Sequence, residues 1–201
     1  MELDHLAVAG KTLEEAAAHV EAALGLPMQP GGTHPRFGTH NRLLGLGPGV
    51  YLEAIAIDPD APAPERPRWF DLDRLNGPPH LRNWIARVHD LDAALARHPG
   101  AGAPLDLARG DLRWRMAVPD DGVLPYDNRF PALIQWQAGG HPADRLPDAG
   151  ARLKRLVVTH PEAVALRAAL ADLTDPHIVF EPGPPALRAE IDTPSGTRVL
   201  T

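Results

Sequence analysis

A strand followed by a capped helix occurs three times along the chain, and this repeat constrains the fold more than any other feature. The first copy has the apolar run 3–9, and Thr12 and Glu15 then have the spacing of a capping box, in which each side chain satisfies a backbone N–H of the other. Apolar residues recur at helical spacing as far as Gly25, where we expect the helix to end. The start of the chain therefore reads as one strand and one amphipathic helix.

The other two copies repeat this opening. The second has the apolar run 83–88, and we expect Asp90 to cap its helix. The third has the run 156–158, and Thr159 and Glu162 again have capping-box spacing. Three strand-like pieces follow each helix, near 28–33, 40–46 and 50–57, near 103–109, 111–118 and 130–137, and near 177–182, 186–192 and 197–200. Each unit therefore reads as βαβββ over roughly 50 residues, and we predict an α+β fold of repeated βαβββ modules.

Proline and glycine divide the chain between these units. The 23 prolines and 18 glycines cluster between the periodic segments, as expected for many short elements joined by turns. We predict a first βαβββ module over 1–58, a second over 82–142 and a third, shorter βαβββ-like unit over 150–201. The stretch 59–81 holds six prolines and is predicted to be a linker.

Composition excludes several classes of function. The chain has no cysteine, so it has no disulfide framework, zinc finger, iron–sulfur cluster or thiol nucleophile. Its net charge is −6 and it has no run of basic residues, so nucleic acid is not an expected partner. No apolar run reaches the ~20 residues of a membrane helix, and the first residues lack the features of a signal peptide. We therefore expect a cytoplasmic protein with no membrane partner.

Glu53 is the sharpest candidate for a functional residue. It interrupts the most apolar strand of the chain, in which Tyr51, Ile55 and Ile57 share its face. A carboxylate in such surroundings is costly unless it is paired. A histidine, an arginine or a metal ion could be the partner, so a structural ion pair and a ligand-facing role both remain open. His5 is the second candidate, either as a buried, hydrogen-bonded histidine or as a partner of Glu53.

Other polar residues could line the same site. His34, His40 and Asn41 lie in a segment between two strands, where they either satisfy backbone groups of a turn or reach a pocket. Arg113 and Arg115 share one face of a strand, as a solvated edge or as an anion-binding surface. In the second unit, Gln135 occupies the position that corresponds to Glu53, and His141 follows shortly after.

Several short motifs, taken in order, resemble the glyoxalase-like branch of the vicinal oxygen chelate (glyoxalase, bleomycin resistance and dioxygenase) superfamily. They are LDHL at 3–6, GTHN at 38–41, YLE at 51–53, RWR at 113–115, FP at 130–131 with IQW at 134–136, and HP at 141–142. The resemblance implies paired βαβββ modules whose mixed sheets curl around a cavity. It also implies functions that range from lyases and isomerases to non-enzymatic small-molecule binders.

The resemblance implies metal ligands on the first and last strands of two modules. His5 and Glu53 match the pair of the first module. The second module departs from the pattern, because the position of His5 falls near Asn83 or Trp84, and Gln135 offers a neutral amide. A catalytic site usually has three protein ligands and an open position, so Gln135, His141 or His80 would complete the set.

Two functions follow as alternatives. The first is a glyoxalase-like lyase or isomerase, in which a divalent ion (zinc, nickel, manganese or iron) held by His5 and Glu53 stabilises an enolate or alkoxide and Glu53 or a histidine moves the proton. The second is a metal-free small-molecule-binding protein, with arginines as anchors. Its aromatic walls would be Tyr51, Trp84, Trp114 and Trp136. A structural or interaction module with a filled cavity is a third reading, and a homodimer is compatible with each.

Overall fold

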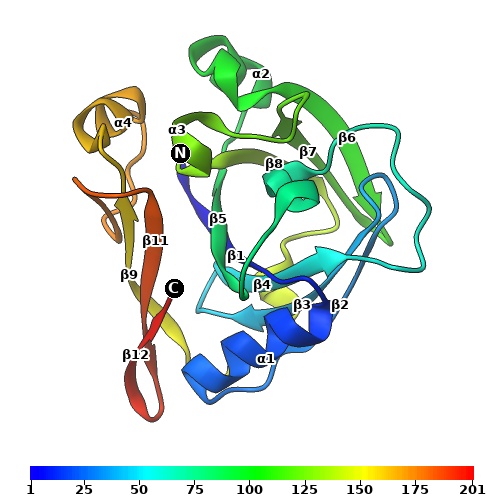
Figure 1. Cartoon of the computed structure of the whole chain (residues 1–201), viewed down its shortest axis with the longest axis vertical. Helices are drawn as coiled ribbons and strands as arrows, with labels where there is room; N and C mark the ends of the chain where they lie inside the picture. Colours follow the sequence, from blue (N-terminus) through cyan, green and yellow to red (C-terminus); the bar gives the residue numbers. More distant parts are fainter.

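Two sheets build the protein in the computed structural model, which describes residues 1–201 (Figure 1). The larger sheet has eight strands in the order β2-β3-β4-β1-β5-β8-β7-β6, and the smaller has four in the order β10-β9-β11-β12. The larger sheet consists of β1 (Glu2–Ala9), β2 (Gln29–His34), β3 (Thr39–Gly45), β4 (Tyr51–Ile57), β5 (His80–Arg87), β6 (Ala103–Arg109), β7 (Leu112–Val118) and β8 (Ala132–Ala138). The smaller consists of β9 (Arg152–Thr159), β10 (Ile178–Glu181), β11 (Ala186–Thr193) and β12 (Gly196–Leu200).

The large sheet is mixed and curled, as the resemblance to glyoxalase-like proteins implies. Its first strand in each half pairs in parallel with the last, β1 with β4 and β5 with β8, and the two halves join through antiparallel pairing of β1 with β5. The curl brings the two edge strands, β2 and β6, near each other, and Arg36 Nη1 donates to the carbonyl of Asp106 at 3.2 Å beside this seam. The curled sheet therefore forms a half-barrel whose two edge strands lie close together.

Local sequence signals place the first two long helices. Thr12 Oγ1 accepts the N–H of Glu15 at 3.2 Å at the start of α1 (Leu13–Leu24), and Gly25 ends it with a φ of 70°. Asp90 caps α2 (Leu91–Arg97) through the N–H of Ala93. The other helical segments are η1 (Trp69–Arg74), η2 (Pro99–Ala101), α3 (Pro125–Asn128), η3 (Pro142–Arg145) and α4 (Ala163–Ala169). None of the helices is long and apolar enough to cross a membrane.

The third unit differs from the first two in two respects. Its first strand, β9, pairs in parallel with β10 and antiparallel with β11, whereas the first strand of each earlier unit pairs in parallel with the last. The capping box expected at its helix is also wrong, because β9 continues through Thr159 and α4 begins at Ala163. His160 Nδ1 accepts the N–H of Glu162 instead. The small sheet stands beside the large one and contacts α1 and β5 (Figure 1).

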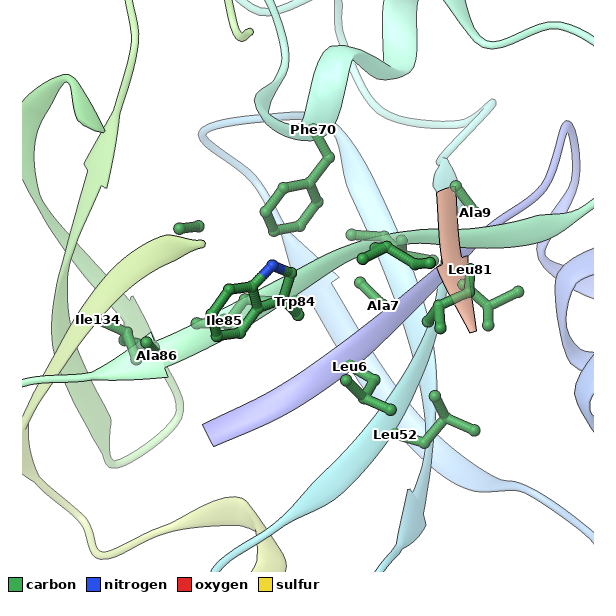
Figure 2. Packing of buried hydrophobic residues seen from close by; sticks show 14 of the residues in the cluster. Leu6, Ala7, Ala9, Leu52, Phe70, Leu81, Trp84, Ile85, Ala86 and Ile134 are labelled. Atoms are coloured by element: carbon green, nitrogen blue, oxygen red, sulfur yellow. The ribbon is translucent and has the colours of Figure 1, made fainter. Parts of the chain in front are cut away.

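The Pro-rich segment 59–81 joins β4 to β5 and also fills the half-barrel. Trp69, Phe70 and Leu72 of η1 are buried and belong to the main hydrophobic core. Figure 2 shows Phe70 on one side of β1 and β5, with Leu6 and Leu52 on the other. The prediction of a linker did not include this contribution to the core. Proline content indicates turns, but it does not indicate whether the aromatic residues of a segment are buried.

Candidate functional site

A bulge at the start of β1 brings two neighbouring side chains, Asp4 and His5, into one buried cluster. The register of β1 against β5 shifts between Leu3 and His5, and such a bulge re-aims the side chains around it. His5 Nδ1 donates to Asp4 Oδ1 at 2.6 Å. Trp136 Nε1 and His141 Nε2 donate to Asp4 Oδ2 at 2.9 and 3.0 Å. Asp4 is fully buried, so its charge depends on these three donors.

The donors around Asp4 determine its protonation state. Burial favours the neutral form, but the hydrogen bonds from His141 and His5 outweigh it and hold the pKa of Asp4 well below its usual value. His141 Nδ1 accepts the N–H of Ala143 at 3.2 Å, so the proton of His141 lies on Nε2 and points at Asp4. In the same way, Asp4 keeps a proton on Nδ1 of His5 and leaves its Nε2 toward the cavity.

Glu53 meets His5 across the interior face of the sheet. Oε2 of Glu53 lies 3.7 Å from Nε2 of His5, and Oε1 accepts a hydrogen bond from Asn41 Nδ2 at 2.5 Å. Tyr51 stacks on the ring of His5, with ring centres 4.4 Å apart. Burial, together with the charges of Asp4 and Glu53, raises the pKa of Tyr51 well above its usual value. The partners of the buried carboxylate are thus a histidine and an amide, and no arginine pairs with it.

Asn41 connects this pair to a cation at the opening of the half-barrel. Its Oδ1 accepts hydrogen bonds from the N–H of Gly32 at 2.8 Å and from Arg109 Nη1 at 3.4 Å. Arg109 Nη1 also donates to His34 Nε2 at 3.3 Å, and His34 Nδ1 donates to Thr39 Oγ1 at 3.0 Å. Burial, assisted by the charge of Arg109, lowers the pKa of His34 to about 3. His34 is therefore neutral at pH 7.

These side chains line a cavity of about 30 Å³. Trp69 and Phe70 of η1 close it from above, and Trp69 also packs edge-on against His34 at 5.0 Å. An outer pocket of about 190 Å³ shares His34, Trp69 and Trp114 with the cavity and lies between β2 and β6. The cavity is lined by His5, His34, Asn41, Tyr51, Glu53, Trp69, Phe70, Arg109, Trp114, Met116, Ile134 and Trp136.

The structure brings together one group of the residues predicted for the site. His5, His34, Asn41, Tyr51, Glu53, Trp114 and Trp136 line the cavity. His141 does not line the cavity but stands behind it, bonded to Asp4 and packed edge-on against Tyr51 and Trp136. The predicted ligand role of His141 does not fit this position, because its Nε2 proton is donated to a carboxylate and its Nδ1 accepts a backbone N–H.

Gln135, Arg113 and Arg115 face away from the cavity. On β8 the cavity face carries Ile134 and Trp136, and the amide of Gln135 instead bonds the backbone of His89 and Leu91. The predicted correspondence of Gln135 with Glu53 was therefore wrong by one residue. A shift of one residue along a strand moves the side chain to the other face of the sheet. On β7, Arg115 likewise pairs with Asp92 at 2.8 Å, and Arg113 donates to backbone carbonyls.

Trp84, His40 and His80 also lie outside the cavity. Trp84 donates to the carbonyl of Arg129 and contacts Phe180 of the small sheet, so it belongs to the packing between the sheets. His40 lies on β3 and pairs with Ala56 of β4. Because it is next to Asn41 in sequence, its side chain lies on the opposite face of the sheet from Asn41. His80 Nδ1 donates to the carbonyl of Pro78 at the start of β5. None of them lines the site that the sequence predicted for them.

Sequence reasoning missed Asp4 and five residues that line the cavity: Trp69, Phe70, Arg109, Met116 and Ile134. Simple alternation places Asp4 and His5 on opposite faces, and no sequence signal reveals the bulge that overrides it. Arg109 continues the alternation of Leu105 and Leu107, which could have placed it on the inner face of β6. Trp69 could have been found as part of an aromatic pair inside a Pro-rich segment.

The donor atoms do not fit a metal centre with three or more protein ligands. His5 Nε2 and Glu53 Oε2 converge, but no group of three or more histidine, aspartate or glutamate side chains does. In the second half of the sheet, Ile134 of β8 lines the cavity, and Asn83 is the residue of β5 that pairs with Ala7. Neither residue is a histidine or a carboxylate that could act as a further ligand. The guanidinium of Arg109 adds a positive charge to the same cavity, which opposes a divalent cation.

One domain family and one solved structure with a similar fold agree with this architecture. The family described as a glyoxalase-like domain matches residues 3–174. A hypothetical protein from Staphylococcus aureus has 14% identity and a TM-score of 0.63, with 92% of this chain and 87% of that chain covered. Methylmalonyl-CoA epimerase from Mycobacterium tuberculosis has 18% identity and a TM-score of 0.42, with 69% and 88% covered. The search of curated protein sequences gives no match.

Proposed function

Because the chain belongs to the glyoxalase-like domain family of the vicinal oxygen chelate superfamily, we propose that it is a small-molecule enzyme of the lyase or isomerase type. The observation that carries the proposal is the buried pair of Glu53 and His5, whose facing atoms are 3.7 Å apart in an enclosed cavity. A carboxylate in such a place suits proton transfer at a carbon next to a carbonyl group.

The proposed step uses groups of this chain alone. The carboxylate of Glu53 takes the proton from the carbon, and the electron pair of the C–H bond moves onto the carbonyl oxygen to form an enolate. Return of the proton to a different position gives an isomer, and loss of a leaving group from the neighbouring carbon gives a lyase product. Asn41 positions the carboxylate through its hydrogen bond to Oε1. Asp4 fixes the tautomer of His5, whose Nε2 can exchange a proton with Glu53.

A metal-dependent version of this function would use His5 and Glu53 as ligands of zinc, nickel, manganese or iron. The two-ligand donor set and the nearby Arg109 support it less well than the metal-free step, so no step is assigned to a metal. The two versions differ in a measurable way, since chelation abolishes only the metal-dependent reaction. We expect no stoichiometric metal after purification without chelator, and activity that survives dialysis against EDTA.

Proton exchange tests the function before its substrate is known. In D₂O, a panel of small carbonyl compounds followed by ¹H NMR should include one whose C–H signal beside the carbonyl disappears faster with protein than without it. Glu53→Gln should slow this exchange by at least about 100-fold, the usual loss on removal of a general base. Glu14→Gln on the exposed face of α1 is the matched control and should exchange at the wild-type rate. Equal exchange by wild type and Glu53→Gln contradicts the proposal.

A metal-free binding protein is the second candidate. The aromatic lining and the closure of the cavity by Trp69 and Phe70 favour it, because they suit retention of a ligand. Saturable binding of a panel compound without any exchange at its carbon atoms would support this function over the enzyme.

A further inference from the structure

We propose that Arg109 is an anion-binding residue of the site, and that the substrate of the proposed function is a small carboxylate. Arg109 is the only lysine or arginine among the residues that line the cavity. The cavity otherwise holds the carboxylate of Glu53, with buried Asp4 directly behind His5. An anionic ligand would be repelled there unless a cation balanced these charges.

The guanidinium of Arg109 has unused donors. No carboxylate of the protein lies within 4.0 Å of it, and its hydrogen bonds all come from Nη1, to His34 and Asn41 at 3.3 and 3.4 Å. The Nε and Nη2 edge makes no hydrogen bond with the protein. This edge is a planar pair of donors that matches the two oxygens of a carboxylate.

The backbone of β2 makes room for Arg109. A Cβ atom on Gly32 would lie 2.7 Å from Arg109 Cδ, so the absence of a side chain at Gly32 lets the arginine stem cross the seam from β6. Its head then meets Asn41 and His34, which lie inside the half-barrel. Gly32 also donates its N–H to Asn41 Oδ1 at 2.8 Å, which fixes the amide that the arginine contacts.

Asn41 holds the cation and the catalytic carboxylate apart. Its Oδ1 faces Arg109 and its Nδ2 faces Glu53, so the two charges do not neutralise each other. A ligand with a carboxylate at one end and a carbonyl-activated carbon at the other can therefore contact both residues. The outer pocket adjoins this cavity, because His34, Trp69 and Trp114 line both.

Binding of pyruvate, compared with its neutral methyl ester, tests the proposal. Tryptophan fluorescence and calorimetry at constant ionic strength should show saturable pyruvate binding to the wild type, at least tenfold tighter than binding of methyl pyruvate. Arg109→Gln should weaken pyruvate binding at least tenfold. Arg113→Gln removes the same charge from the outer face of the adjacent strand and should change the dissociation constant less than twofold. No saturable pyruvate binding, equal binding of the ester, or an equal loss in Arg113→Gln overturns the proposal.

Inorganic phosphate and two more variants complete the experiment. Tighter binding of inorganic phosphate than of pyruvate overturns the assignment to a carboxylate. Gly32→Ala displaces the arginine without removing its charge, and it should also lose pyruvate binding, which keeps the test valid if Arg109→Gln does not fold. Glu53→Gln should bind pyruvate at least as tightly as the wild type. If binding depends on Arg109 but no proton exchange is seen, only the proposed function is refuted. If exchange depends on Glu53 but binding does not depend on Arg109, only this inference is refuted.

Discussion

Asp4 shows how one buried carboxylate can organise a site without touching its ligand. Its oxygens accept hydrogen bonds from His5, Trp136 and His141, which belong to both halves of the large sheet. Each donor would otherwise be a buried polar group without a partner, at a cost of about 1–3 kcal/mol. Asp4 therefore joins the two halves and sets the proton on His5 at the same time.

Asp4→Asn should lower the free energy of unfolding by about 3–5 kcal/mol at pH 7, because an amide cannot accept from all three donors. The contribution of Asp4 is present above its unfolded pKa of 3.8 and declines as the pH falls toward its much lower folded pKa. The difference between variant and wild type should therefore shrink below about pH 4. Urea titrations of both proteins, with exposed Asp144→Asn as control, measure it. A loss under about 1 kcal/mol at pH 7 contradicts this account.

His34 predicts a second dependence on pH. Its pKa falls from 6.5 to about 3 on folding, so between these values the unfolded chain holds a proton that the folded protein does not. Stability should therefore decrease as the pH falls below 6.5, with His34 contributing up to about 1.4 kcal/mol per pH unit. His34→Gln should lack this part of the slope in urea titrations between pH 4 and pH 7. Parallel slopes for the two proteins would rule out a buried neutral His34.

At the level of elements, the segment around η1 depends on its contact with a neighbouring loop. Phe70 and Asp71 have positive φ values of 59° and 56°, which bulky residues rarely adopt. The N–H of Asp71 donates to the carbonyl of Gly122 at 3.0 Å. A Cβ atom on Gly122 would lie only 2.0 Å from the carbonyl oxygen of Arg68. Close backbone approach at Gly122 therefore holds the aromatic pair over the cavity.

Two glycine substitutions can separate the effect of the close contact between Gly122 and Arg68 from the effect of a positive φ alone. Gly122 and Gly110 both have positive φ, 76° and 58°, but a Cβ atom on Gly110 would meet nothing within 4 Å. Gly110→Ala should cost about 1 kcal/mol, and Gly122→Ala at least about 2 kcal/mol more. Gly122→Ala should also raise hydrogen exchange across 67–74. Similar costs and unchanged exchange in both variants would show that the approach does not hold the segment.

Sequence periodicity predicted the strands of the large sheet well but not every face of them. A continuous apolar run located β4, which is buried on both faces, and alternating apolar residues located β7, each within a residue or two. Glu53 was found because a charge in an apolar strand stands out. Gln135 was assigned to the wrong face because a one-residue error in matching two strands reverses every side chain. The orientation of Asp4 depends on a bulge, and the position of Trp69 at the cavity depends on contacts with strands distant in sequence. Neither feature leaves a local sequence pattern, so neither could be predicted.

At the scale of the whole molecule, the third unit packs on the first two as part of one core. Most of its buried apolar residues belong to the same hydrophobic cluster as the large sheet. Phe180 of β10 meets Trp84 of β5 at 6.5 Å between ring centres. The N-terminal amine also donates to the carbonyl of Asp172 at 2.8 Å, and the N–H of Leu3 donates to Asp175 at 3.2 Å. β1, which carries His5, is thus held by the large sheet and by the loop between α4 and β10.

This shared core predicts a single unfolding transition. All four tryptophans, Trp69, Trp84, Trp114 and Trp136, lie in or beside the large sheet, and only Trp84 also contacts an aromatic ring of the small sheet. Their fluorescence therefore reports mainly the large sheet, whereas far-ultraviolet circular dichroism reports both sheets. The two signals should change at the same urea concentration, since a continuous core unfolds cooperatively. Phe180→Ala removes the contact with Trp84 and should lower both midpoints together. Because Phe180 is only half-buried, the loss in free energy of unfolding should be smaller than the ~3–5 kcal/mol of a fully buried phenylalanine. A dichroism change that precedes the fluorescence change would mean that the small sheet unfolds separately, and that β1 keeps its position without it.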